Sequence, residues 1–166
     1  MFIPQKLFQF EEKSLIIVSG RRTADLYQCF NGEIDKIDSV TVETPKYSDK
    51  EGFFMRLGKG KFFKAGSALE DQNLEIDRRF IKELKDKVVL VSDEFKEIYL
   101  FASDHAKKNL PDALPEKTRD KITLISQGNY LKEHPLKIVE MIDRKKSNQK
   151  TKFISEAALK ILGKRK

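Results

Sequence analysis

A basic, glycine-containing and aromatic stretch at residues 52–69 holds the side-chain types that contact nucleic acids. Lysine and arginine bind phosphates, aromatic rings stack on unpaired bases, and glycines let the backbone approach another molecule closely. The stretch therefore predicts a loop that contacts the phosphates of an RNA. The alternative is a solvated connection whose paired phenylalanines hold it against the core. The charged residues of the stretch are all basic, namely Arg56, Lys59, Lys61 and Lys64, and its phenylalanines are Phe53, Phe54, Phe62 and Phe63.

A helix start follows this loop directly. Ser67 is a favourable N-cap residue, and Glu70 three positions later completes a capping box. Apolar residues then recur at helical spacing, which predicts a helix over residues 67–86. Asp77 lies inside the apolar stripe, where we expect it to pair with a neighbouring base, a functional carboxylate being the alternative. We expect residues 50–66 to be mobile in the free protein, because glycines and like charges give them little to bury.

The net charge of +7 is concentrated at the C-terminal end of the chain. From Arg144 onward there are nine basic residues and one acid, whereas the preceding part is close to neutral. Such an end suits a nucleic acid or another anionic surface, and a solubilising end is the alternative. We expect a folded domain at residues 1–145 and a basic tail at 146–166 that contains a short helix. The residues of this end expected to contact nucleic acid are Lys145, Lys146, Lys164 and Arg165.

Several classes of protein do not fit the composition. No apolar run is long enough to span a membrane, so a membrane partner is not expected. The N-terminal residues lack the basic-then-apolar pattern of a secretory signal. The single cysteine, Cys29, cannot form an intrachain disulfide, and we expect it to be a packed thiol in a strand. These features predict a cytoplasmic protein, and no pattern indicates its oligomeric state.

Short apolar runs and turn signals predict three strands near the N-terminus, at residues 15–19, 24–30 and 34–43. Asn31-Gly32 joins the second to the third, and it is a strong hairpin signal because both central residues of a type I′ turn take positive φ. The irregular alternation early in the third strand indicates a bulge.

The second half of the chain alternates between strand and helix patterns. Residues 88–91 predict a strand buried on both faces, and residues 95–100 belong to a predicted helix. Prolines at 111 and 115 indicate a loop or short helical pieces, residues 122–125 predict a further strand, and Pro135 opens a helix. This order predicts an α/β fold with a ribonuclease H-like mixed sheet, in which three N-terminal strands with a hairpin precede alternating helices and strands.

Three short motifs occur in order along the chain. Residues 15–27 read Leu-Ile-Ile-Val-Ser-Gly-Arg-Arg-Thr-Ala-Asp-Leu-Tyr, residues 66–69 read Gly-Ser-Ala-Leu before an arginine-containing helix, and residues 90–96 read Leu-Val-Ser-Asp-Glu-Phe-Lys. Together they resemble the middle domain of the archaeal and eukaryotic class 1 peptide-chain release factors and their bacterial relatives. The resemblance covers residues 12–145 and implies that the partner is the ribosome or an RNA.

The catalytic motif of that family is not retained in this chain. The family's Gly-Gly-Gln would fall on Lys64, Ala65 and Gly66, and the absent glutamine is the residue that promotes ester hydrolysis in the peptidyl-transferase centre. In this respect the chain resembles surveillance relatives such as Pelota, whose middle domain also lacks the motif and does not release peptide. The codon-reading and partner-binding domains of the family are not expected within 166 residues, so neither activity is carried over.

Other chemistry has little support in the sequence. His105 and His134 lack metal-ligand spacing and are expected at the surface. The glycines and lysines of residues 58–61 lack the spacing of a Walker-type phosphate loop. We expect no cofactor and no metal. A ribonuclease H-like fold nonetheless raises the alternative of a metal-dependent nuclease, for which the candidate acids are Asp25 with Asp35, Asp38 or Asp93.

The sequence-based hypothesis is therefore a non-catalytic RNA- or ribosome-associated protein that contacts phosphates through its basic loop. The alternatives are a metal-dependent nuclease, a peptidyl-tRNA hydrolase that acts through a displaced residue such as Gln72, and a protein-interaction module that uses an exposed sheet edge.

Overall fold

The computed structural model describes residues 1–43, 57–58, 61–62 and 67–148, and the side chains of residues 1–43 and 73–148. One mixed sheet of five strands has the order β3-β2-β1-β6-β7. β1 pairs antiparallel with β2 and parallel with β6, β2 pairs antiparallel with β3, and β6 pairs parallel with β7. This topology confirms the predicted α/β class with a ribonuclease H-like sheet. The strands are β1 (Ser14–Ser19), β2 (Thr23–Phe30), β3 (Glu33–Thr41), β6 (Glu97–Ala102) and β7 (Ile122–Gln127).

The hairpin between β2 and β3 forms where the sequence predicts it. Asn31 and Gly32 have φ values of 50° and 75°, as the central residues of a type I′ turn require. Leu26 pairs with Asp38, but Tyr27 pairs with Lys36, so one residue of β3 is left without a partner. The expected bulge in the third strand is therefore present, and it accounts for the break in alternation.

The long helix α1 (Ser67–Ser92) begins at the predicted residue but continues beyond the predicted end. The strand expected at residues 88–91 is wrong, because these residues form the last turns of α1. Val88 is buried on the stripe that already holds Phe80 and Leu84, whereas Leu90 is 83% exposed on the opposite face. Helical spacing thus decides the outcome, although a run of β-branched residues resembles a strand.

The helix expected at residues 95–100 is also wrong, because most of these residues form β6. This strand lies between β1 and β7, is buried on both faces, and is followed by α2 (Asp104–Ala113) and α3 (Glu116–Arg119). Its nearly continuous apolar sequence is typical of a parallel strand in the middle of a sheet. Pro111 lies inside the last turn of α2, so the segment expected to be loop or short helical pieces is mostly helical.

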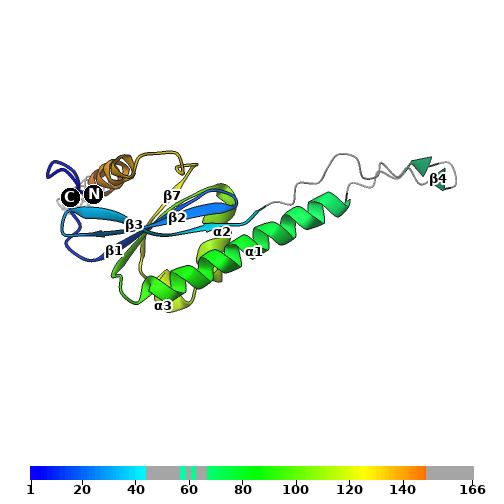
Figure 1. Cartoon of the computed structure of the whole chain (residues 1–166), viewed down its shortest axis with the longest axis horizontal. Coiled ribbons are helices and arrows are strands. Elements are labelled where there is room, and N and C mark those ends of the chain that lie inside the picture. The colour runs from blue at the N-terminus through cyan, green and yellow to red at the C-terminus, as the bar shows by residue number, and fades with distance from the viewer. Residues whose placement is uncertain (44–56, 59–60, 63–66, 149–166) are drawn as a thin grey trace, which may run out of the picture.

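Helices cover both faces of the sheet and enclose two apolar clusters (Figure 1). On one face, α1 and α2 pack against side chains such as Leu15, Ile17 and Leu26. On the other face, the helix at residues 135–148 and the N-terminal segment pack against Ile16 and Val18. Alternate residues of β1 therefore supply the two cores, as the two-residue period of a strand requires.

The C-terminal helix starts at Pro135 as predicted and runs to residue 148. Its residues Ile138, Val139 and Ile142 are buried against the sheet. The helix continues through residue 145, where the predicted domain ends, and the proposed tail helix lies outside the described residues. Among the helices that the structure describes, none has the length and apolar character needed to cross a bilayer.

Candidate nucleic-acid interface

The predicted basic loop connects the end of β3 to the start of α1. The described part of this connection is a pair of two-residue strands, β4 (Leu57–Gly58) and β5 (Lys61–Phe62), in which Gly58 pairs with Lys61. Figure 1 shows both strands beyond the N-terminal end of α1. The other expected loop residues, Arg56, Lys59, Lys64, Ala65 and Gly66, lie outside the described residues, as does the expected mobility of residues 50–66. The side chains of Lys61 and of the capping-box residues are likewise not described.

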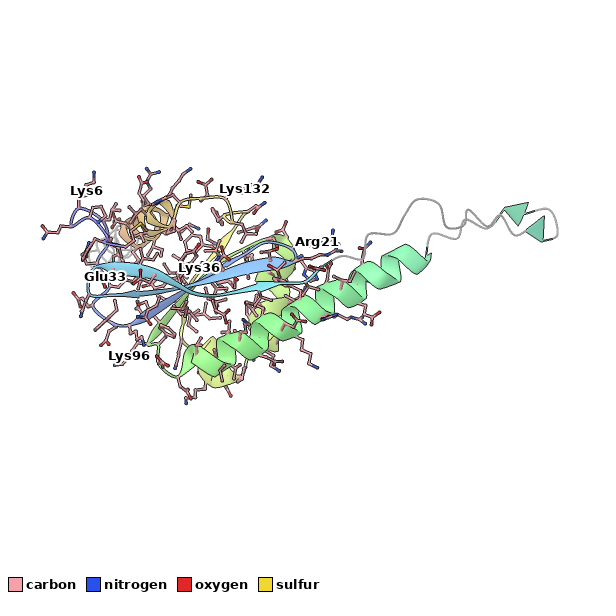
Figure 2. The ribbon with its side chains drawn as sticks, in the orientation of Figure 1. Lys6, Arg21, Glu33, Lys36, Lys96 and Lys132 are labelled. Carbon is pink, nitrogen blue, oxygen red and sulfur yellow. The ribbon has the colours of Figure 1, made fainter. Side chains whose placement is uncertain are left out.

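Both stems of this connection meet at Arg22, in the turn between β1 and β2. The carbonyl oxygen of Arg22 accepts a hydrogen bond of 3.0 Å from the backbone N–H of Val42, just after β3. Its guanidinium donates to Asn73 Oδ1 at 2.7 Å and to Asp77 Oδ1 at 3.1 Å, both on α1. Arg21 donates to the other carboxylate oxygen of Asp77 at 3.0 and 3.2 Å. We call this group of five residues the Arg22 junction, and Figure 2 shows Arg21 beside α1.

Asp77 is the central acceptor of the Arg22 junction and is only 2% exposed. Burial acts to raise its pKa, but the hydrogen bonds from Arg21 and Arg22 oppose this effect, and the pKa is lowered below its ordinary value. The carboxylate is therefore ionised at neutral pH and joins the β1–β2 turn to α1. The expectation that Asp77 pairs with a neighbouring base is confirmed.

Of the four C-terminal basic residues expected to contact nucleic acid, the structure describes the first two. Lys145 Nζ donates to Ser126 Oγ at 2.9 Å. Lys146 Nζ lies 4.2 Å from the centre of the Phe8 ring and 5.0 Å from that of Tyr99, and 3.4 Å from a carboxylate oxygen of Glu97. Both lysines are thus engaged within the folded body. Lys164 and Arg165 lie outside the described residues.

The acids considered for a nuclease are separated, and each has its own cation. Ile16 and Ile17 occupy the centre of β1, where such a nuclease needs its leading carboxylate. Within the described part of the chain, no group of three or more acids, histidines or cysteines could hold a metal ion. The pairs are Asp25 with Lys36 at 2.7 Å, Asp35 with the N-terminal amine at 2.7 Å, Asp38 with Lys87 at 2.6 Å, and Asp93 with Lys117 at 2.7 Å.

The cysteine, the two histidines and the glutamine considered for chemistry lie at separate places in the fold. Cys29 is buried as expected, and burial followed by the nearby charge of Asp35 raises the pKa of its thiol. His134 is exposed, as expected, and its Nδ1 accepts a hydrogen bond from the N–H of Leu136 at the start of the C-terminal helix. His105 is half-buried on α2, where it lines a surface groove, so its expected place at the surface holds in part. Gln72 lies on α1, and its side chain is not described.

The edges of the sheet are β3 and β7, and one end of β3 is already covered. Ile3 donates from its N–H to the carbonyl of Gly32, and Ile34 donates from its N–H to the carbonyl of Met1. Phe2 forms a β-bridge with Glu33. The N-terminal segment therefore occupies the start of the β3 edge, which leaves the rest of β3 and the β7 edge for an edge-binding partner.

Three cations on α1 form a surface that the sequence analysis did not assign to a site. Arg78, Lys82 and Lys85 line a groove between α1 and α2. Their spacing of four and three residues places them along one side of a helix, and this spacing is the signal that could have identified them.

Comparison with known proteins finds similar solved structures, of which two are described here. No known protein family matches the sequence, and no curated protein matches it. The crystal structure of the archaeal translation termination factor aRF1 is 12% identical, with a TM-score of 0.48, and the similarity covers 90% of this chain and 42% of that one. A structure described as an archaeal protein is also 12% identical, with a TM-score of 0.41, over 90% of this chain and 41% of that one. The chain thus spans less than half the length of either neighbour, and the resemblance to a release-factor middle domain in particular stays a prediction.

Proposed function

We propose that this protein associates with RNA or with the ribosome, as a non-catalytic relative of release and surveillance factors. Phosphates would be bound by the basic loop at residues 52–69, through Arg56, Lys59, Lys61 and Lys64. The single observation that supports this most is that both stems of the loop are tied to Arg22. The connection that contains this cationic stretch is therefore held by the folded body on both sides, at Val42 after β3 and at Asn73 and Asp77 on α1.

The physical argument is one of charge and anchoring. Four cations with no acid among residues 52–69 would repel one another in isolation, and a polyanion relieves that repulsion while releasing its own counterions. The Arg22 junction holds the end of β3 and the third turn of α1 together, so the two stems of the loop start from fixed positions. A fixed base reduces the ordering entropy that the loop must lose on binding.

The proposal that the protein is non-catalytic rests on which residues stand at the end of the loop. Where the release factors carry Gly-Gly-Gln, this chain has Lys64, Ala65 and Gly66. Lysine and alanine offer no side-chain amide to orient water beside an ester, and catalysis depends on such placement. A lysine at this position instead adds another phosphate-binding charge.

The test is a salt series with a loop variant and a matched control. Lys59, Lys61 and Lys64 are changed together to alanine, and the control changes Lys6, Lys96 and Lys132 to alanine. Figure 2 shows these three control lysines on the body of the protein, away from the loop. Binding to a short fluorescein-labelled single-stranded RNA is measured by anisotropy, and binding to ribosomal subunits by co-sedimentation.

Each lost phosphate contact should reduce the slope of log K against log salt by about 0.7 to 0.9, so the loop variant should lose about 2 to 3 units. The control variant should keep the slope of the unchanged protein. An unchanged slope in the loop variant would show that the loop is not the contact. Hydrolysis of peptidyl-tRNA by the unmodified protein would show that the non-catalytic assignment is wrong.

A further inference from the structure

A groove of about 510 Å³ lies between α1 and α2. These two helices cover one face of the sheet, and the N-terminal segment and the C-terminal helix cover the opposite face. The groove combines a row of cations with an apolar floor, and the proposed loop function does not use it. Its lining comes from both helices. The lining residues are Leu74, Arg78, Ile81, Lys82, Lys85, His105, Asn109 and Ala113.

The cations of this groove are not neutralised by the protein. No acidic residue lines it, and in the part of the chain that the structure describes none of the three cations forms an ion pair. Other cations of the same helix behave differently, since Arg79 pairs with Glu83 at 2.8 Å and Lys87 with Asp38 at 2.6 Å. The groove is therefore a local surplus of positive charge beside neighbours whose charges are balanced.

The floor of the groove is apolar, and this distinguishes it from a surface that binds phosphates alone. Leu74 is 52% exposed, and Ile81 and Ala113 contribute further apolar surface. His105 and Asn109 supply polar groups on the α2 wall. An RNA backbone gains nothing from contact with an exposed leucine, whereas a peptide that is acidic on one side and apolar on the other uses both features.

The dimensions fit a helical ligand. Leu74 and Lys85 are 11 residues apart on α1, which corresponds to about 16 Å or three helical turns. The three cations recur at i, i+4 and i+7, so acidic residues at the same spacing on a bound helix would face them in turn. We propose that this groove binds an acidic amphipathic helix of a partner protein.

The segments of this chain that lie largely outside the described residues do not suit the groove, because both are basic. Residues 44–66 contain six basic and two acidic residues, and residues 149–166 contain six basic and one acidic. Both segments would bring positive charge to a positive groove. The ligand is therefore expected from another protein, and this inference is independent of the proposed RNA contact at the loop.

The test uses a designed peptide of about 14 residues with glutamates at i, i+4 and i+7 and leucines on the adjoining face, which covers the length of the groove. Its control is a scrambled peptide of the same composition. Binding of each fluorescein-labelled peptide, and of a short single-stranded RNA, is measured by anisotropy. The protein variants are K82E/K85E and L74Q in the groove and K6E/K132E as the matched charge control. Figure 2 shows Lys6 and Lys132 on the side of the sheet away from α1.

We expect the designed peptide to bind the unchanged protein about tenfold more tightly than the scrambled one. K82E/K85E should weaken it about tenfold, because two attractions become repulsions, and L74Q should weaken it several-fold by removing apolar contact. K6E/K132E should bind as the unchanged protein does. Because Leu74 is half exposed, L74Q tests the groove even if the charge-reversal variant fails to fold, which circular dichroism would reveal.

Three results would overturn the proposal. If the scrambled peptide bound as tightly as the designed one, the binding would be non-specific attraction between opposite charges. RNA binding that depends on Lys82 and Lys85, without peptide binding, would make the groove an RNA surface. Absence of peptide binding at about 1 mM protein would exclude a useful affinity, and self-association lost in K82E/K85E would then assign the groove to a second copy of the chain.

Discussion

Replacing Asp77 by asparagine is the sharpest structural test of the Arg22 junction. The substitution keeps the shape of the side chain but removes the charge that three guanidinium N–H groups contact. An amide offers one acceptor oxygen and directs its NH₂ group at a guanidinium, which is also a donor. We therefore expect Asp77→Asn to fold with reduced stability.

The magnitude follows from how exposed each partner is. Breaking a fully buried ion pair costs about 3–5 kcal/mol. The side chain of Arg21 is 64% exposed, so it can return to water, and its share is about 0–1 kcal/mol. The side chain of Arg22 is 20% exposed, and a hydrogen bond from a charged donor contributes about 1.5–3 kcal/mol. We expect a loss of about 2–4 kcal/mol in the free energy of unfolding, or about 5–15 °C in Tm for a chain of this size.

The same substitution predicts a pH dependence with a definite sign. The pKa of Asp77 lies below its ordinary value of 3.8 in the folded protein, so the folded state binds this proton less readily than the unfolded state. The stability that Asp77 contributes is therefore complete above pH 3.8 and is lost as the pH falls through the folded-state pKa. The gap between the unchanged protein and Asp77→Asn should be constant near neutral pH and should narrow below pH 3.8.

Urea unfolding at about pH 7 and about pH 3, followed by circular dichroism, measures both effects. Arg21→Ala is the matched control, with an expected loss of at most about 1 kcal/mol. The reasoning would be refuted if Asp77→Asn were as stable as the unchanged protein at neutral pH. It would also be refuted if the gap between the two proteins were the same at both pH values.

Three further predictions concern the tail, the thiol and the loop. Deleting residues 163–166 should leave Tm unchanged, whereas deleting residues 142–166 removes the second half of the helix at residues 135–148 and should abolish the cooperative unfolding transition in a thermal melt. Cys29 should react with a thiol reagent only as urea unfolds the chain, because burial raises the pKa of its thiol and blocks access; rapid reaction of the native protein would contradict this. Replacing residues 64–66 by Gly-Gly-Gln should not confer release activity in a peptidyl-tRNA hydrolysis assay, because placement of the glutamine matters as much as its identity.

The parts of the fold that local physics determines could be predicted from the sequence. Asn31-Gly32 requires positive φ at both positions, so the hairpin of β2 and β3 follows from it. The start of α1 at Ser67 and the start of the C-terminal helix at Pro135 also agree with residue preference. In each case a single conformation satisfies the local backbone without help from distant residues.

The errors in the predicted secondary structure begin where a segment fits both the pattern of a buried strand and that of a helix. Val88 satisfies both a buried strand and the helical stripe of α1, and only packing against the sheet selects the helix. Ending α1 too early displaced the next element, so β6 was assigned to a helix although its buried, nearly all-apolar pattern is that of a central parallel strand. Burial on both faces removes the alternation by which a strand is normally recognised.

For the candidate site, the sequence predicted which residue types take part but not how the elements bring them together. The sequence identified the basic stretch and the pairing of Asp77 with a base, but the Arg22 junction joins residues 22, 42, 73 and 77 across three elements. No local spacing reveals such a contact. The groove between α1 and α2 was missed because its walls come from two separate helices, and only the i, i+4 and i+7 spacing of its cations on α1 could be seen in the sequence.

The basic side chains of this protein are of two kinds: some are paired within the folded body, and others have no partner in the described structure. Arg22 and Lys146 are bound to acids, aromatic rings or backbone, and moving them onto a phosphate would cost the contacts that hold α1 and the C-terminal helix in place. Lys82 has no such partner in the described structure and can be neutralised by a ligand without loss to the fold. Net charge alone therefore does not locate a binding surface here. We expect an anion to gain most at the unpaired cations of the α1–α2 groove and at the acid-free stretch of residues 52–69.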